Sequence, residues 1–165
     1  MKLFSFCLAV MSLLFVGCGE KTDSKSKELS TWRVKGGNLK GTQYSSLDQI
    51  TRENVSNLKL AWRYNSGEAD TADNRSQIQC NPIIVDGVLY ATSPTLKAFA
   101  LDAATGKQLW RFDSTKEAGG GLGVNRGVTY WEDGEDKRIL YSLGQWLYAL
   151  DARTGKRLWH FQMVH

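Results

Sequence analysis

One arginine within a glycine-rich stretch is the first residue whose surroundings indicate chemistry. Arg126 lies in GGGLGVNRG, residues 119–127. Glycines in such a stretch let the backbone approach another group closely, because they carry no side chain. A guanidinium held in place can bind a carboxylate through charge-assisted hydrogen bonds. The pattern favours contact between Arg126 and a bound group; the alternative is a surface arginine at the start of an outer strand.

Other kinds of site receive little support from the residue types present. His160 and His165 lie at the extreme end of the chain, and Cys80 is the only cysteine beyond Cys18. No metal-ligand spacing and no Ser/His/Asp arrangement stands out in the sequence. The net charge is +4, with the basic residues dispersed among acidic ones. A chain without a basic run or stripe is a poor candidate for nucleic-acid binding.

The first thirty residues are expected to target and tether the protein. Residues 1–17 hold one lysine and an apolar run that is too short for a transmembrane helix and is typical of a signal peptide. The run ends in FVGC and resembles the lipobox of bacterial lipoproteins, which implies cleavage before Cys18 and lipidation of its thiol. Gly19 follows, so we expect the outer membrane, facing the periplasm. The alternative is an ordinary signal peptide with a chance cysteine.

The rest of the chain divides into a tether and a folded domain. Residues 18–30 are mostly charged and polar, and such a composition cannot bury enough surface to fold. Residues 31–165 form the predicted domain. In it ALDAATGKQLW, residues 100–110, recurs as ALDARTGKRLW, residues 149–159, and LKLAWRY near Trp62 is a fainter third copy. Copies that recur about every 49 residues are typical of propellers, solenoids and arrays.

Local patterns favour a propeller over a β-solenoid. Asp86 and Gly87 join two β-rich runs and predict a hairpin. Residues 132–138 are expected to form a polar turn, and residues 46–58 a helical turn or two. Each unit of about 49 residues then has four strands, which is the blade of an all-β propeller. The strands are expected within residues 81–85, 88–93, 96–102, 107–112, 126–131, 139–144, 145–151 and 156–161.

The repeated phrase has a structural interpretation. Its aspartate can accept hydrogen bonds from turn amides, and its glycine suits the left-handed conformation. Its tryptophan is expected to pack between neighbouring blades, because a large flat ring buries much apolar area at low entropic cost. Trp62, Trp110 and Trp159 are therefore interpreted as docking residues between blades.

The spacing Ala-x-Asp-x-x-Thr-Gly-Lys-x-x-Trp resembles the tryptophan-docking motif of the quinoprotein dehydrogenases. These enzymes are eight-bladed propellers that oxidise alcohols or sugars with pyrroloquinoline quinone (PQQ). The segment from Trp32 to Tyr64, which begins WRVKGGNLKGTQYSS, is similar to their N-terminal segment. VNRGVTYW, residues 124–131, is similar to a segment whose arginine reaches the cofactor. The resemblance spans Trp32 to Phe161, about two to three blades.

The resemblance implies a cofactor site. It places Arg126, Asn125, Gln79, Gly120 and Gly121 at PQQ. Gln79 stands where many members have a glutamate, and the two glycines stand where many have adjacent cysteines. These departures are closer to the sugar-oxidising, membrane-associated branch and make methanol a doubtful substrate. In this family the catalytic base and the Ca²⁺ ligands come from later blades, so none is expected here.

The leading hypothesis is the N-terminal portion of a periplasmic PQQ-dependent dehydrogenase, inactive alone, that passes electrons to a cytochrome or a membrane quinone. One alternative is a non-catalytic propeller lipoprotein of the same repeat, acting as an envelope assembly scaffold. Another is a short protein that self-associates to complete a ring. The segments at residues 32–64 and 119–127 count against the scaffold.

Overall fold

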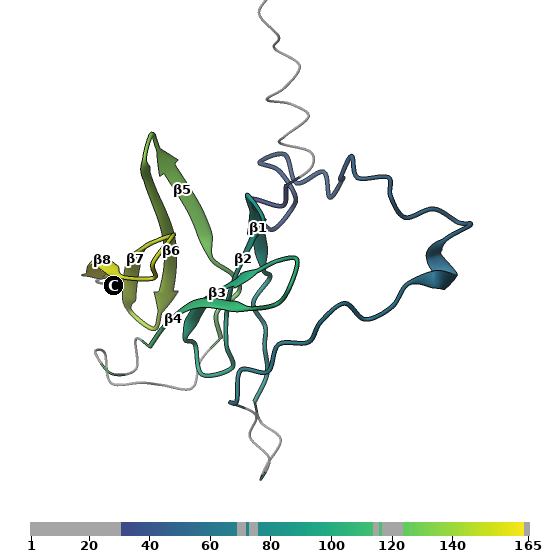
Figure 1. Cartoon of the computed structure of the whole chain (residues 1–165). Helices are drawn as coiled ribbons and strands as arrows, with labels where there is room; N and C mark the ends of the chain where they lie inside the picture. Colours follow the sequence, from purple (N-terminus) through teal and green to yellow (C-terminus); the bar gives the residue numbers. More distant parts are fainter. Residues whose placement is uncertain (1–30, 69–71, 73–75, 114–115, 117–123, 164–165) are drawn as a thin grey trace, which may run out of the picture.

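The chain folds into two antiparallel sheets that each follow the order of the sequence (Figure 1). The computed structural model describes residues 31–68, 72, 76–113, 116 and 124–163. The first sheet contains β1 (Ile83–Val85), β2 (Val88–Thr92), β3 (Ala98–Asp102) and β4 (Gln108–Phe112). The second contains β5 (Thr129–Asp133), β6 (Asp136–Leu143), β7 (Trp146–Asp151) and β8 (Arg157–Gln162). The prediction of four strands per repeat is confirmed.

Two-residue turns connect the first two strands of each sheet. Asp86 and Gly87 have φ values of 48° and 78°, and the hairpin predicted at this pair is confirmed. The polar turn predicted over residues 132–138 was too long, because β5 continues to Asp133 and β6 begins at Asp136. Gly134, with a φ of 56°, closes the hairpin tightly. Charged residues can occupy these strand ends because most of them are exposed to solvent.

The repeated phrase forms the same turn between the last two strands of each sheet. The Thr105 amide and hydroxyl both donate to Oδ1 of Asp102, at 2.8 and 2.7 Å. Gly106, with a φ of 71°, donates its amide to the Asp102 carbonyl. The second copy repeats these contacts around Asp151, where the Thr154 amide and hydroxyl donate at 2.7 and 2.6 Å. Hydrogen bonds from Thr154, chiefly from its hydroxyl, lower the pKa of Asp151.

The main hydrophobic core lies between the two sheets. Phe112 of β4 contacts the rings of Tyr141 and Tyr148, with the Phe112 and Tyr148 centroids 5.8 Å apart. Tyr90 of β2 contacts the ring of Trp110 on its own sheet and that of Tyr130 on the other. Burial of this apolar surface is the principal force that holds the sheets together. The core also includes Ile83, Val85, Leu96, Ala98, Ala100, Val128, Ile139, Leu143, Leu150 and Ala152.

The N-terminal segment covers the opposite face of the first sheet. Trp62 and Tyr64 pack over a smaller cluster of Ala91, Phe99 and Leu101, and the Tyr64 and Phe99 ring centroids are 5.0 Å apart. Figure 1 shows the residues before this contact as a wide excursion away from the sheets.

That excursion is anchored at its start by backbone pairing. Trp32 and Ile84 exchange backbone hydrogen bonds of 3.0 and 2.8 Å, which attaches the segment to β1. Within residues 46–58 the helical turn takes the form of one short 3-10 helix, Val55–Asn57. Among the described residues, no helix has the length and apolar character that crossing a bilayer requires.

Candidate functional site

The backbone segments that precede β1 and β5 lie side by side. The Asn81 amide donates to the Arg126 carbonyl at 3.1 Å, and the Asn81 side-chain Nδ2 donates to the same oxygen at 3.0 Å. A parallel bridge pairs Asn81 with Gly127. Positions 45 residues apart in the chain therefore meet at one end of the first strands of both sheets. Gln79 lies two residues before Asn81 and so belongs to the same region.

The Arg126 side chain is available to a ligand. Its residue is exposed, and across the part of the chain that the structure describes its guanidinium has no hydrogen bond or ion pair. Five N–H donors with no internal acceptor suit a planar carboxylate or another oxygen anion. The carbonyl of the same residue accepts two hydrogen bonds from Asn81, so an exposed side chain extends from a fixed backbone.

Gln79 and Cys80 lie on the extended segment before β1, and both are half-buried. The Gln79 Nε2 donates to Oε1 of Gln77 at 3.1 Å. The Cys80 Sγ accepts a hydrogen bond from the Thr92 amide at 3.3 Å, which attaches this segment to the end of β2. Gln79 thus presents an uncharged amide in the region where Arg126 presents a positive charge.

Asn125 is directed into the protein rather than toward solvent. It is 5% exposed, and its Nδ2 donates to the Ser142 carbonyl at 2.9 Å. Its Oδ1 accepts from the Gly127 amide at 2.9 Å and from the Thr92 hydroxyl at 3.4 Å. Both ends of the side-chain amide therefore have partners within the protein, and this network was not evident from the sequence. Gly120, Gly121 and Cys18 lie outside the described residues.

The tryptophans of the repeated phrase lie on the turn of the next unit. Trp62 donates from Nε1 to the Ala103 carbonyl at 3.1 Å, and Trp110 donates in the same way to Ala152 at 2.9 Å. A Cβ placed on Gly106 would lie 2.5 Å from the Trp62 indole. The repeated glycine is therefore needed for space as well as for its positive φ. Trp159 is 37% exposed, and its indole N–H has no partner among the described residues.

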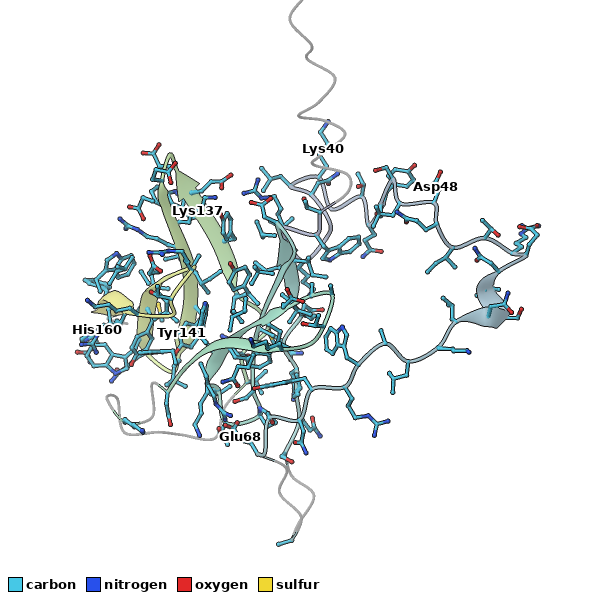
Figure 2. The ribbon with its side chains drawn as sticks, in the orientation of Figure 1. Lys40, Asp48, Glu68, Lys137, Tyr141 and His160 are labelled. Atoms are coloured by element: carbon cyan, nitrogen blue, oxygen red, sulfur yellow. The ribbon has the colours of Figure 1, made fainter. Side chains whose placement is uncertain are left out.

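A buried carboxylate, Glu68, joins the incoming segment to the first sheet. The Glu68 side chain is 8% exposed and accepts hydrogen bonds from the Thr95 amide and hydroxyl. It forms ion pairs with Arg111 and with Lys97, whose Nζ lies 3.1 Å from Oε1. Lys97 also lies 3.5 Å from Asp113. Figure 2 shows Glu68 at the end of the molecule opposite to Lys137, which marks the β5–β6 hairpin tip.

A second polar cluster occupies the hairpin end of β5. Arg33 forms an ion pair with Glu132 and lies 5.0 Å above the Tyr130 ring, whose hydroxyl donates to Glu132 at 3.0 Å. The Arg33 hydrogen bond is the main cause of a lowered pKa at Glu132. Burial is the main cause of a raised pKa at Tyr130. These residues line an open cleft of about 440 Å³ with Gly37 and Leu39, at the opposite end of β5 from Arg126.

These features define a class of protein: a propeller whose four-stranded blades are joined by tryptophan docking. The family model for the β-propeller domain of the PQQ glucose/ethanol/alcohol dehydrogenases matches residues 32–163. The chain belongs to this family. The fold class and the family resemblance inferred from the sequence are both confirmed.

Individual relatives agree with this assignment. The dehydrogenase subunit of the quinone alcohol dehydrogenase of Gluconobacter oxydans is 45% identical over 105 residues, which cover 61% of this chain and 13% of that protein. The 1-butanol dehydrogenase (cytochrome c) of Thauera butanivorans is 38% identical over 131 residues, covering 76% and 16%. The chain thus spans only a small part of the length of these relatives.

Solved structures agree as well. The quinohemoprotein alcohol dehydrogenase ADHIIG of Pseudomonas putida superposes with a TM-score of 0.68 at 34% identity, covering 86% of this chain and 20% of that one. A europium-containing methanol dehydrogenase gives a TM-score of 0.63 at 28% identity, covering 86% and 24%. The names of these relatives specify alcohols, whereas the description of the family model includes glucose as well as ethanol and alcohol.

Proposed function

We propose that this chain forms part of the PQQ-binding propeller of a dehydrogenase that oxidises alcohols. Family membership supports the proposal, and the main structural support for it is the state of the Arg126 side chain. This guanidinium is exposed, its backbone is fixed by Asn81, and it has no internal acceptor in the described part of the chain. An exposed guanidinium on a fixed backbone suits a cofactor that carries negative charge.

The residues at this end of the strands differ in how well they fit PQQ, which carries three carboxylates and an ortho-quinone. Arg126 can hold a carboxylate or a quinone oxygen with charge-assisted hydrogen bonds. Gln79 can add a hydrogen bond but no charge, and it is half-buried in the same region. The Asn125 side chain is 5% exposed and both ends of its amide have partners inside the protein, so we propose that it supports the site rather than contacting the cofactor. The contact of Gly120 and Gly121 with the cofactor stays a prediction.

The contribution of this chain to the reaction is binding and charge. When bound, PQQ supplies an electrophilic quinone that takes up two electrons from the alcohol. Arg126 favours negative charge on the oxygen that it contacts, and a positive group aimed at developing charge promotes such a reaction. Gln79 orients a neighbouring oxygen without changing the net charge of the site. The proton acceptor for the substrate hydroxyl is proposed to lie in another part of the whole protein.

The metal, the electron acceptor and the location complete the proposal. Across the described residues, no group of three His, Cys, Asp or Glu side chains could hold a metal ion. The assignment of the Ca²⁺ ligands to other blades rests on the family resemblance. Electrons pass to a cytochrome or a membrane quinone. The two acceptors named for relatives, cytochrome c and quinone, support this choice. The protein faces the periplasm and is held at the outer membrane by a lipid on Cys18.

Titration of the full-length protein with PQQ tests the proposal. Arg126→Ala is expected to weaken PQQ binding about 10- to 100-fold, because a hydrogen bond to a charged group contributes about 1.5–3 kcal/mol. Arg126→Lys keeps the charge but loses the planar fork, so an intermediate affinity is expected. Arg52→Ala, at an exposed arginine of the N-terminal excursion, is the matched control. Equal affinities for all variants would remove Arg126 from the site. A full-length protein that binds no PQQ but retains envelope proteins on pull-down would favour the scaffold.

A further inference from the structure

We infer that Asn81 and Asn125 are positioning residues that fix one peptide group and thereby aim Arg126 at the cofactor. The inference rests on the proposed function and adds residues that act through Arg126. The peptide group is the one between Arg126 and Gly127, whose carbonyl belongs to Arg126 and whose N–H belongs to Gly127. Both of its polar ends are held by asparagines from different parts of the chain.

Asn81 holds the carbonyl end of this peptide. Its backbone amide and its side-chain Nδ2 donate to the same Arg126 oxygen, at 3.1 and 3.0 Å. A carbonyl oxygen has two lone pairs, so these two donors satisfy it fully. The approach is close: a Cβ built on Gly127 would lie 3.3 Å from the Asn81 carbonyl oxygen. The glycine thus allows the two segments to run side by side at this point.

Asn125 holds the N–H end of the same peptide. Its Oδ1 accepts from the Gly127 amide at 2.9 Å, while its Nδ2 donates to Ser142 of β6 at 2.9 Å. The Thr92 hydroxyl of β2 donates to the same Oδ1 at 3.4 Å. Because Asn125 is 5% exposed, solvent gives these groups no ready substitute for the bonds. The peptide is therefore tied through Asn125 to both sheets.

The consequence is a preorganised arginine. Rotation of the Arg126–Gly127 peptide would break the two hydrogen bonds from Asn81 and the one to Asn125 together. The backbone from which the guanidinium extends is therefore set before any ligand arrives. Ordering a flexible cation during binding reduces affinity, and fixing part of it beforehand reduces that loss. Asn125 was predicted to contact PQQ. In this inference it instead holds the backbone of Arg126 in place.

The matched pair of variants is Asn81→Ala and Asn54→Ala in the full-length protein. Asn81→Ala removes one donor to the Arg126 carbonyl and keeps the backbone donor. Asn54→Ala removes two side-chain hydrogen bonds in the exposed excursion, from Nδ2 of Asn54 to the Gln49 carbonyl and from the Thr51 amide to Oδ1 of Asn54, both at 2.8 Å. Asn81 is only half-buried, so its variant is expected to fold. We expect about tenfold weaker PQQ binding for Asn81→Ala and no change for Asn54→Ala.

Two readouts separate positioning from general support of the fold. In the Arg126→Ala background, Asn81→Ala should cause no further loss of PQQ affinity, because coupled residues are non-additive. Without cofactor, the Gly127 amide should exchange with solvent about tenfold faster in Asn81→Ala than in the unaltered protein. Equal weakening in both backgrounds, or unchanged exchange at Gly127, would overturn the inference. Failure of the unaltered protein to bind PQQ would overturn the proposed function, and this inference with it.

Discussion

The indole of Trp110 lies directly on Gly155 of the next sheet. A Cβ built on Gly155 would be 2.5 Å from Cε3 of that indole, and the Trp110 Nε1 donates to the nearby Ala152 carbonyl at 2.9 Å. Trp62 and Gly106 have the same relationship one unit earlier. The contact between units is therefore a tryptophan on one side and a glycine with no room for a side chain on the other.

Gly155→Ala is expected to destabilise the protein by about 3 kcal/mol. Part of this cost is the left-handed backbone, with a φ of 70°, and the larger part is the clash with the indole. Gly144→Ala is the matched control, because Gly144 has a φ of 56° but nothing within 4 Å of an added Cβ. We expect about 1 kcal/mol for the control. Urea unfolding measures both, and equal losses would contradict the packing role.

Thr154→Val is expected to make stability less dependent on pH in the acid range. The Thr154 hydroxyl is the main cause of the lowered pKa of Asp151 in the folded protein. A carboxyl group with a lowered folded pKa contributes stability above its unfolded pKa, near 3.9, and that contribution disappears as pH falls through the folded value. Because the Asp151 carboxyl is partly exposed and solvent screens it, the variant should lose only about 0.5 kcal/mol at pH 7, and the difference from the unaltered protein should shrink toward about pH 2.

The measurement is the free energy of unfolding between about pH 7 and pH 2, with Thr129→Val as control. Thr129 is exposed on β5, and its hydroxyl has no hydrogen bond within the described residues. NMR titration of the Asp151 carboxyl should also show a higher pKa in Thr154→Val. A stability difference that stays constant with pH would show that the hydroxyl acts by packing alone.

Glu68→Gln is expected to destabilise the protein by about 1–3 kcal/mol. The amide keeps the shape of the side chain, but it leaves Lys97 and Arg111 without the buried carboxylate of Glu68. Both cations retain some exposure, which places the loss below that of a fully buried pair. Glu135→Gln, at the exposed β5–β6 turn, should change the free energy of unfolding by less than about 0.5 kcal/mol. Similar values for the two variants would exclude a role of Glu68 in attaching the incoming segment.

Cys18→Ser is expected to release the protein from the membrane fraction. The lipobox resemblance implies that the Cys18 thiol carries the lipid, and serine supplies no thiol for that linkage. Intact-mass measurement of the mature protein should show the lipid on the unaltered chain and its loss in the variant. Cys80→Ser, at the half-buried cysteine near β2, is the control and should stay in the membrane fraction. Membrane retention of both variants would favour an ordinary signal peptide.

The amino-acid sequence alone determined the repeat, the number of strands and most of the turns, although the turn expected over residues 132–138 was too long. Asp86-Gly87 specifies a tight hairpin, and Asp102 with Thr105 and Gly106 specifies a closed turn, because each depends on neighbours a few positions away. The spacing of Trp62, Trp110 and Trp159 indicated docking between units. They recur at a nearly constant spacing, and such a repeat places each tryptophan at the same position in its unit. The family could likewise be identified from these motifs.

Tertiary structure alone decided how the polar residues are used. Asn125 and Arg126 are adjacent in sequence, yet one faces the interior and the other faces solvent. That choice depends on Asn81 and Thr92, which reach this segment only when the two sheets pack together, and on Ser142 of the neighbouring strand β6. The amino-acid sequence did not predict the Glu68 network, for a related reason. A carboxylate in a linking segment reveals its partners only when the fold brings distant cations to it, because such contacts leave no periodic pattern in the sequence.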